Sequence, residues 1–318
     1  MFGIWHACCF HPWKLRRGER TVRIFQRTLA KEVRFSGVGL HSGAVVRAKI
    51  LPAAPDTGIV FHRTDLGADI PAGVGNVVET SYATVLASGA ARLSTVEHFL
   101  SALCGMQVDN ALVEVDGPEM PILDGSSLEI ARALAGAGYL EQASRRRFVD
   151  VDVPRKLHRD GSMVALSASA DLDILVTIDF PAAAIGKQWL RFTLTPEKYL
   201  SEIAPARTFV LRHQIEALRT AGLARGGSLE NAIVVEDGIV HNPGGLRFPD
   251  EFVRHKMLDF LGDIALVGRP VRGFFLAVRP GHTINRDLVE LLSGSSRPIA
   301  PAVSMASSGT PAELFVTA

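Results

Sequence analysis

The sequence predicts an α+β protein in which β-sheets are layered with helices. Strand-like and helix-like segments are mixed without the regular β-α-β alternation that builds a doubly wound sheet. A polar and basic segment at 141–147 divides the chain, and the same kinds of element recur after it. At 318 residues the chain is also long for a single hydrophobic core. We therefore expect two domains that join at this segment.

The first half, from residue 21 to about 140, contains both periodicities. Apolar residues recur at helical spacing in 94–105, and the strand-like segment 111–115 ends at an Asp-Gly-Pro turn. The expected strands are 22–34, 45–51 and 111–115, and the expected helices are 94–105 and 128–140.

The second half has a similar mixture. An Asp-Gly pair at 237–238 lies between two short apolar segments and predicts a hairpin. The expected strands are 148–153, 163–168, 172–179, 232–235, 239–241 and 273–278, and the expected helices are 196–203, 211–221 and 250–267.

Composition excludes several classes of protein. The net charge of +1 provides no basic excess for binding nucleic acid. No apolar run approaches the roughly 20 residues that a membrane span needs. Three cysteines, two of them adjacent, do not form a disulfide framework, and residues 1–20 lack the order of a secretory signal. We expect a cytoplasmic protein with an irregular extension at 1–20.

The expected helix 250–267 carries polar residues on a largely apolar background. His255, Asp259 and Asp263 follow one another at intervals of four, so they share one face. A histidine and an aspartate one turn apart can supply two ligands to zinc. The same spacing also occurs in ordinary hydrogen-bonded or ionic pairs, so the spacing alone leaves both interpretations open.

The segment Ser94–His98 also allows two interpretations. Ser94 and Glu97 have the spacing of a capping box at a helix start, which would leave His98 without a function. In the functional interpretation, which does not exclude a capping box, His98 is a third zinc ligand and Glu97 is the general base beside it. Catalytic zinc has three protein ligands and an open fourth position, where a nearby carboxylate can accept a proton from water.

His282 follows Pro280-Gly281 after an expected buried strand. A histidine in such a loop is either simply solvated or functional. In a site that hydrolyses an amide, a protonated His282 could give a proton to the leaving amine, and Asp263 could orient it.

Several motifs together resemble the UDP-3-O-acyl-N-acetylglucosamine deacetylases of lipid A biosynthesis, in the same order over about 21–300. The motifs are Gly37–Gly43, Ser94–His98, Asn110, Pro118–Ser126, Ala206–Phe209, Gly226–Ser228, Leu246–Phe248 and Asp250–Asp259. The last of these, DEFVRHKMLD, is the most specific.

The resemblance implies a fold of two similar α+β domains packed as a sandwich, with the active site at their interface. It places the domains at 21–143 and 144–305, followed by a tail at 306–318. It also implies a small insert in each domain, at about 56–90 and at about 179–195. The second insert would form an apolar tunnel for the acyl chain.

The resemblance also assigns the site. It implies one zinc ion per chain, or ferrous iron, that is bound by His98, His255 and Asp259. Glu97 is the implied base, and His282 with Asp263 beside it is the implied proton donor. The substrate-contacting positions fall on Thr208, which stabilises the oxyanion, on Lys256 near the metal, and on Phe209 in the substrate passage.

The implied function is hydrolysis of the N-acetyl group of UDP-3-O-(3-hydroxyacyl)-N-acetylglucosamine with release of acetate, the committed step of lipid A biosynthesis. The alternative is a non-catalytic relative that binds UDP-sugars or acyl groups, although such a protein has no need for Glu97. A purely structural zinc would need a fourth protein ligand, and Cys104 is badly placed on its helix to provide it. We expect a monomer with at most weak attachment to a membrane surface.

Overall fold

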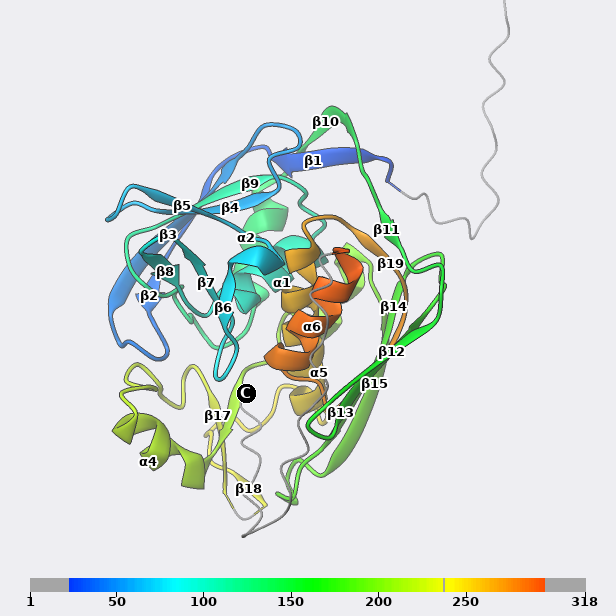
Figure 1. Ribbon diagram of the computed structural model, residues 1–318. Helices are drawn as coiled ribbons and strands as arrows, with labels where there is room; N and C mark the ends of the chain where they lie inside the picture. The colour runs from blue at the N-terminus through cyan, green and yellow to red at the C-terminus, as the bar shows by residue number, and fades with distance from the viewer. Residues whose placement is uncertain (1–22, 237, 295–318) are drawn as a thin grey trace, which may run out of the picture.

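The computed structural model describes residues 23–236 and 238–294 (Figure 1). The expected extension at 1–20 and the expected tail at 306–318 lie outside these residues. A five-stranded sheet and a six-stranded sheet lie on the outside, and the main helices lie between them (Figure 1). The α+β prediction is confirmed.

The first sheet alternates in burial along its strands. In β3 the side chains of Val46, Ala48 and Ile50 are buried, and the residues between them are more exposed. In strand order the sheet comprises β2 (Val33–Val38), β3 (Val45–Pro52), β9 (Ala111–Val115), β4 (Ile59–Arg63) and β5 (Ala68–Pro71). Its buried face packs on α1 (Glu97–Gly105) and α2 (Leu128–Ala137).

The second sheet has the same one-sided pattern, most clearly in β19, where buried and half-buried residues alternate. Its order is β12 (Arg155–Arg159), β13 (Ser162–Ser167), β19 (Val271–Val278), β14 (Leu172–Asp179) and β15 (Lys187–Thr193), and β11 (Val149–Asp150) pairs with β19. The helices α5 (Glu251–Ile264) and α6 (His282–Leu292) cover its buried face. The helix α5 is buried almost all round because α1 packs on its other side.

Three smaller sheets and several short helices complete the fold. The strand β1 (Phe25–Leu29) pairs with β10 (Tyr139–Arg145), which covers much of the expected boundary segment. One small sheet comprises β6 (Val77–Glu79), β7 (Val85–Ser88) and β8 (Ala91–Leu93), and the other comprises β16 (Phe209–Leu211), β17 (Ile233–Glu236) and β18 (Ile239–Val240). The short helices are α3 (Pro196–Lys198), α4 (Arg212–Thr220), two 3₁₀ turns at Val74–Asn76 and Ala265–Val267, and a π-helical turn at Tyr199–Ile203.

Two local features differ from what the sequence predicts, and one local prediction is confirmed. The expected strand 22–34 is two strands, β1 and β2, separated by a turn. The strand β12 was not predicted because its sequence, RKLHR, is too polar to be recognised without its neighbour β13. The predicted helix stop at Gly268 is confirmed, since this residue adopts the left-handed conformation with φ of 73°.

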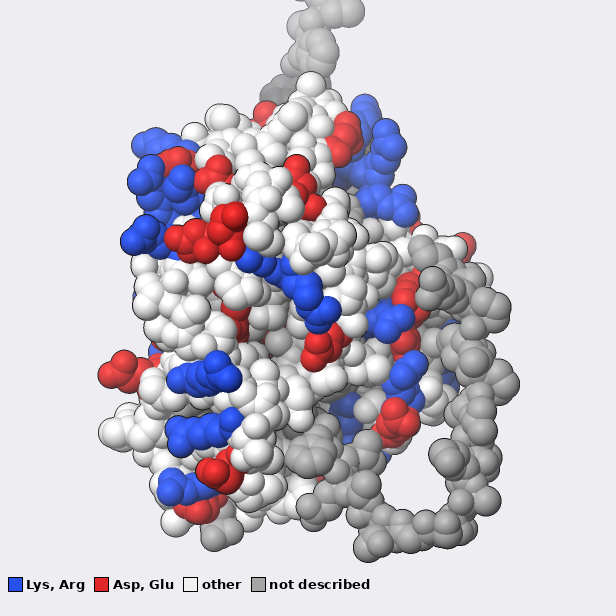
Figure 2. Space-filling view, turned by 60° about the vertical axis from the view of Figure 1, so that its left-hand side comes forward, with Lys and Arg blue, Asp and Glu red and all other residues white. Residues whose placement is uncertain are grey.

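The surface carries charges of both signs. Figure 2 shows one face on which Lys and Arg side chains are interspersed with Asp and Glu, in keeping with the net charge of +1. Among the described residues, no helix combines the length and the apolar character needed to cross a membrane.

Candidate active site

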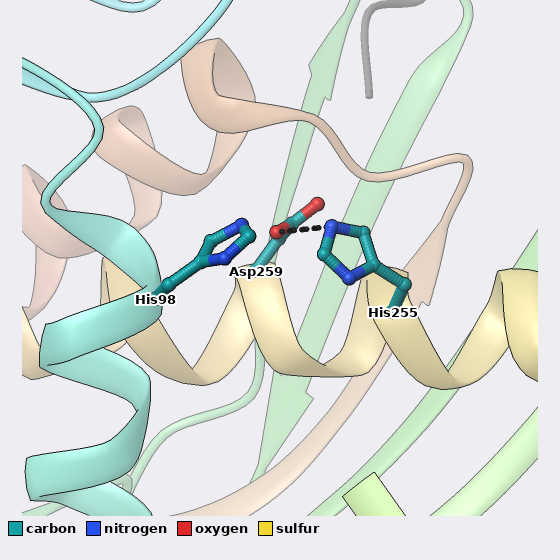
Figure 3. Close-up of side chains that lie close together, drawn as sticks. All are labelled: His98, His255 and Asp259. Carbon is teal, nitrogen blue, oxygen red and sulfur yellow. Dashed lines mark ion pairs between the residues drawn. The ribbon is translucent and has the colours of Figure 1, made fainter. Parts of the chain in front are cut away.

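Three potential metal ligands meet where α1 packs on α5. His98 comes from α1, and His255 and Asp259 come from successive turns of α5, pointing toward one another (Figure 3). Each can offer a ligand atom such that all three atoms lie within 4.8 Å of one another. All three side chains are buried.

The close approach of the two helices depends on Gly262. A Cβ atom at this position would overlap the backbone carbonyl of Glu97. The absence of a side chain therefore allows the start of α1 to lie directly on α5, which brings His98 to the pair on α5.

The hydrogen bonding of His255 suits a metal ligand. Its Nδ1–H donates to the Ala206 carbonyl at 3.1 Å, which leaves the lone pair on Nε2. Nε2 is buried, has no hydrogen-bond partner in the described part of the chain and lies 3.3 Å from Asp259 Oδ1. A neutral nitrogen lone pair facing a carboxylate oxygen is repulsive, and a cation between them would remove the repulsion.

The electrostatics of the cluster lead to the same interpretation. Burial, reinforced by the neighbouring His255, lowers the pKa of His98 to about 3, and burial also lowers the pKa of His255. Burial opposes ionisation of Asp259, but His255 and Lys256 outweigh it, so the pKa of Asp259 is lowered. Two neutral imidazoles and an ionised carboxylate are the protonation states that bind a divalent metal.

Glu97 does not take part in a capping box, so that interpretation was wrong. The helix α1 begins at Glu97 itself, and the Ser94 hydroxyl contacts the Pro118 carbonyl. The physical reason is Thr95, whose φ of 57° departs from the extended backbone of a regular N-cap. The Glu97 carboxylate instead lies within the site, where it accepts a hydrogen bond from the Thr84 backbone N–H at 3.1 Å. Burial raises its pKa to about 7.

His282 lies at the start of α6 and forms a buried pair with Asp263. Its Nδ1–H donates to Asp263 Oδ2 at 2.8 Å, and Asn285 donates to the same oxygen at 2.9 Å. Burial alone would lower the pKa of His282, but the carboxylates of Asp263 and Glu97 outweigh it and raise the pKa to about 9. Within residues 23–236 and 238–294, its Nε2 has no hydrogen-bond partner, and it lies 4.0 Å from Glu97 Oε1.

The remaining predicted residues border this cluster. Lys256 Nζ donates to Asp259 Oδ2 at 3.1 Å and lies 5.6 Å from the centre of the Phe209 ring. Thr208 is held by backbone hydrogen bonds to Gly125 and Ile233. Both Thr208 and Phe209 line a cavity beside His98.

That cavity has a volume of about 340 Å³ and is lined by residues of α4, β16 and β17 together with neighbouring loops and the start of α1. Its apolar lining includes Leu40, Phe209, Val210, Ile215, Leu218 and Leu229. None of the described residues from 179 to 195 lines it, although the second insert was expected there. Residues 187–193 instead form β15, which pairs with β14 at the edge of the second sheet.

Sequence reasoning missed two residues of the site, Thr84 and Asn285. Asn285 lies three positions after His282, so helical spacing would have identified it as a neighbour. Thr84 lies in a polar stretch before β7, and no local pattern connects it with Asp263.

Comparisons with known proteins show which family the chain is similar to. The chain matches the family described as LpxC: UDP-3-O-acyl N-acetylglycosamine deacetylase over residues 26–293. It is 48% identical to the UDP-3-O-acyl-N-acetylglucosamine deacetylase of Anaeromyxobacter sp. (strain Fw109-5), over 83% of this chain and 87% of the relative. It is 46% identical to the protein of the same name from Myxococcus xanthus, over 83% and 85% of the two chains. The enzyme of that name from Phenylobacterium zucineum is 44% identical, over 85% and 94%.

Proposed function

The chain belongs to the family of UDP-3-O-acyl-N-acetylglucosamine deacetylases, and we propose that it holds one zinc ion with His98, His255 and Asp259. It is a hydrolase that removes the N-acetyl group of UDP-3-O-acyl-N-acetylglucosamine in lipid A biosynthesis. The observation that carries the metal assignment is the unpartnered His255 Nε2, which faces the Asp259 carboxylate at 3.3 Å.

The donor set suits a catalytic metal more than a structural one. Two imidazoles and one carboxylate supply three ligands, and a catalytic zinc site keeps its fourth position open. When bound, zinc acts as a Lewis acid that polarises an amide carbonyl and lowers the pKa of water to about 7. Ferrous iron would bind the same ligands, so the metal has to be identified by analysis of the protein.

Glu97 is the general base. Its carboxylate is buried beside His98, and the Thr84 N–H holds Oε2, so Oε1 faces the gap toward His282. A pKa of about 7 leaves Glu97 basic enough to take a proton from the attacking water and ionised enough to do so near neutral pH.

His282 is the general acid. Its pKa of about 9 keeps it protonated at neutral pH, and its Nε2–H has no acceptor among the residues that the structure describes. The substrate amine can occupy the gap between Nε2 and Glu97 Oε1, where it receives the proton as the carbon–nitrogen bond breaks. Acetate and the free amine of the sugar are the products. Glu97 and His282 resemble other catalytic acid–base pairs, in which different surroundings move the pKa values of the two groups apart.

Thr208 and Lys256 contact the reacting amide. The Thr208 hydroxyl is carried by a backbone fixed at both its N–H and its carbonyl, and such a donor can stabilise an oxyanion without rearrangement. The Lys256 ammonium, held against Asp259, brings a positive charge to the same region. Phe209 packs edge-on against Phe252 and lines the cavity, which supports its assignment to the substrate passage.

The 340 Å³ cavity is the site of the acyl chain, in place of the expected tunnel at 179–195. Its apolar side chains begin next to His98, and apolar pockets bind hydrocarbon by removing it from water. The segment 179–195 is not suited to this role, because most of its second half is occupied in the hydrogen bonding of the second sheet.

The proposal also covers the domain boundaries, the cellular location and the oligomeric state. The domains are 21–143, with an insert at about 56–90 that includes β6 and β7, and 144–305, and the packing of α1 on α5 supports an active site between them. The enzyme is cytoplasmic and monomeric and attaches at most weakly to a membrane surface. This fits a substrate that carries both a nucleotide and a single acyl chain.

Metal analysis combined with turnover tests the assignment. Wild-type protein should contain about one zinc per chain and release acetate, and a chelator should abolish turnover until zinc is restored. Glu97→Gln should retain the metal and lose a factor of ~10²–10⁴ in kcat, whereas His255→Ala should lose the metal. His62→Ala, on the surface beside Asp69, is the matched control and should change neither quantity. Full zinc content in His255→Ala, or wild-type turnover in Glu97→Gln, would contradict the corresponding role.

A further inference from the structure

One residue in the loop between β6 and β7 contacts both Glu97 and Asp263. Thr84 lies in the loop between β6 and β7 and is 1% exposed. Its backbone N–H donates to Glu97 Oε2 at 3.1 Å, and its hydroxyl donates to Asp263 Oδ1 at 2.6 Å. The hydroxyl oxygen also lies 3.3 Å from His282 Nδ1.

The hydroxyl of Thr84 completes the hydrogen bonding of Asp263. His282 and Asn285 donate to Oδ2 of this carboxylate, and Thr84 donates to Oδ1. The two oxygens are therefore held from opposite sides, so the carboxylate cannot rotate without losing a charge-assisted hydrogen bond. The orientation of the His282 ring depends on the orientation of that carboxylate.

The backbone N–H of Thr84 fixes the orientation of the Glu97 carboxylate in the same way. Holding Oε2 directs Oε1 toward His282 Nε2, across the gap of 4.0 Å. Both hydrogen bonds come from a single residue, so covalent geometry fixes the distance between the two held carboxylates. The β-branched side chain of threonine also restricts χ1, which fixes the direction of the hydroxyl.

We propose that Thr84 is a positioning residue that sets the placement of the acid His282 relative to the base Glu97, which rests on the proposed roles of those two residues. The residue contacts no reacting atom. It acts by holding Asp263 and Glu97 in one arrangement, across the contact between the β6–β7 loop and the helices α1 and α5.

The substitution Thr84→Val removes the hydroxyl and retains the shape of the side chain and its backbone N–H. A hydrogen bond to a charged group contributes enough that kcat should fall by roughly ten- to a hundred-fold. KM should stay within about twofold, since no contact to substrate is lost, and Thr84→Ser should recover most of the wild-type kcat. A role in folding alone would not produce this combination.

The matched control is Thr80→Val. Thr80 lies in the same loop, and its hydroxyl pairs with that of Thr283 on α6 at 2.9 Å, away from both carboxylates. This variant should keep wild-type kcat and KM. Melting temperature and zinc content should be measured for every variant, and Thr84→Ala replaces Thr84→Val if the valine variant does not fold.

A second measurement needs no turnover. In the metal-free protein, the NMR signal of the His282 Nδ1–H reports its hydrogen bond to Asp263. That signal should move or broaden in Thr84→Val and remain unchanged in Thr80→Val. The proposal is overturned if Thr84→Val keeps kcat within threefold of wild type with an unchanged signal, or if both valine variants lose activity and stability equally. Failure of the proposed function would appear separately, as absent acetate release by the wild-type enzyme.

Discussion

Replacing Asp263 by asparagine should remove the charge that keeps His282 protonated near neutral pH. The substitution retains the size of the side chain and its place on α5. The Asp263 carboxylate lies 2.8 Å from His282 Nδ1 and is the strongest of the groups that raise the pKa of this histidine. Once this charge is removed, burial lowers the pKa of His282.

The size of the effect follows from the pKa. A pKa of about 9, against the ordinary value of 6.5, corresponds to roughly 3 kcal/mol in favour of the imidazolium. At pH 7.5 a group with a pKa of 9 is about 97% protonated, whereas a group with a pKa of 6.5 is about 10% protonated. Asp263→Asn should therefore lose at least about tenfold in kcat/KM at pH 7.5 and less at pH 6.

The assay is the pH dependence of kcat/KM at saturating zinc, from about pH 5.5 to 10. In the wild-type enzyme the alkaline limb should lie near 9, where His282 loses its proton. In Asp263→Asn this limb should move to pH 7 or below. Asp287→Asn is the matched control, because Asp287 lies on α6 as His282 does but pairs with Arg159 on β12 instead of with His282.

The same pair should affect stability in the metal-free protein. The pKa of His282 is raised by folding, so its contribution is fully present below about pH 6.5 and is lost as the pH rises through about 9. Thermal unfolding should show this decline in the wild type and a much weaker decline in Asp263→Asn. An alkaline limb that stays near 9 in the variant would refute the reasoning, because Asp263 could not then be what holds the proton.

Two further predictions concern stability and the acyl site. Glu251 is fully buried and accepts hydrogen bonds from Arg207 and from the Arg247 backbone. Glu251→Gln should therefore lower the free energy of unfolding in urea by about 3–5 kcal/mol, whereas the control Glu32→Gln, at an exposed ion pair, should lower it by less than about 1 kcal/mol. Equal losses would mean that the buried pair is not stabilising. Ile215→Trp should fill the cavity and raise KM for long-chain substrates more than for short-chain ones. The control is His213→Trp, at an exposed position of the same helix. An equal effect on both chain lengths would place the acyl chain elsewhere.

Local sequence predicted the parts of the site that lie on one element. The four-residue spacing of His255 and Asp259 is enough to place them together, because successive turns of a helix stack their side chains. The same holds for the left-handed stop at Gly268 and for the hairpin in which β17 pairs with β18. In each case the relevant interactions lie within a few residues.

Local sequence failed where a long-range contact overrides a local preference. Ser94 and Glu97 have the pattern of a capping box, but the left-handed Thr95 and the contact with Thr84 turn Glu97 into the site. The acyl tunnel at 179–195, which the resemblance implies, stays a prediction; this segment includes β15, which pairs with β14, and α4 contributes to the lining of the cavity beside His98.

The sequence by itself determined the α+β class, the helix that carries His255 and Asp259, and, through its motifs, the family. Only the tertiary structure decided how His98 reaches that helix, through the side-chain-free surface at Gly262, and how Thr84 connects Glu97 with Asp263. The physical reason is that helical periodicity is set by neighbouring residues. The placement of an acid opposite a base is set by packing between segments far apart in the chain, which no local pattern records.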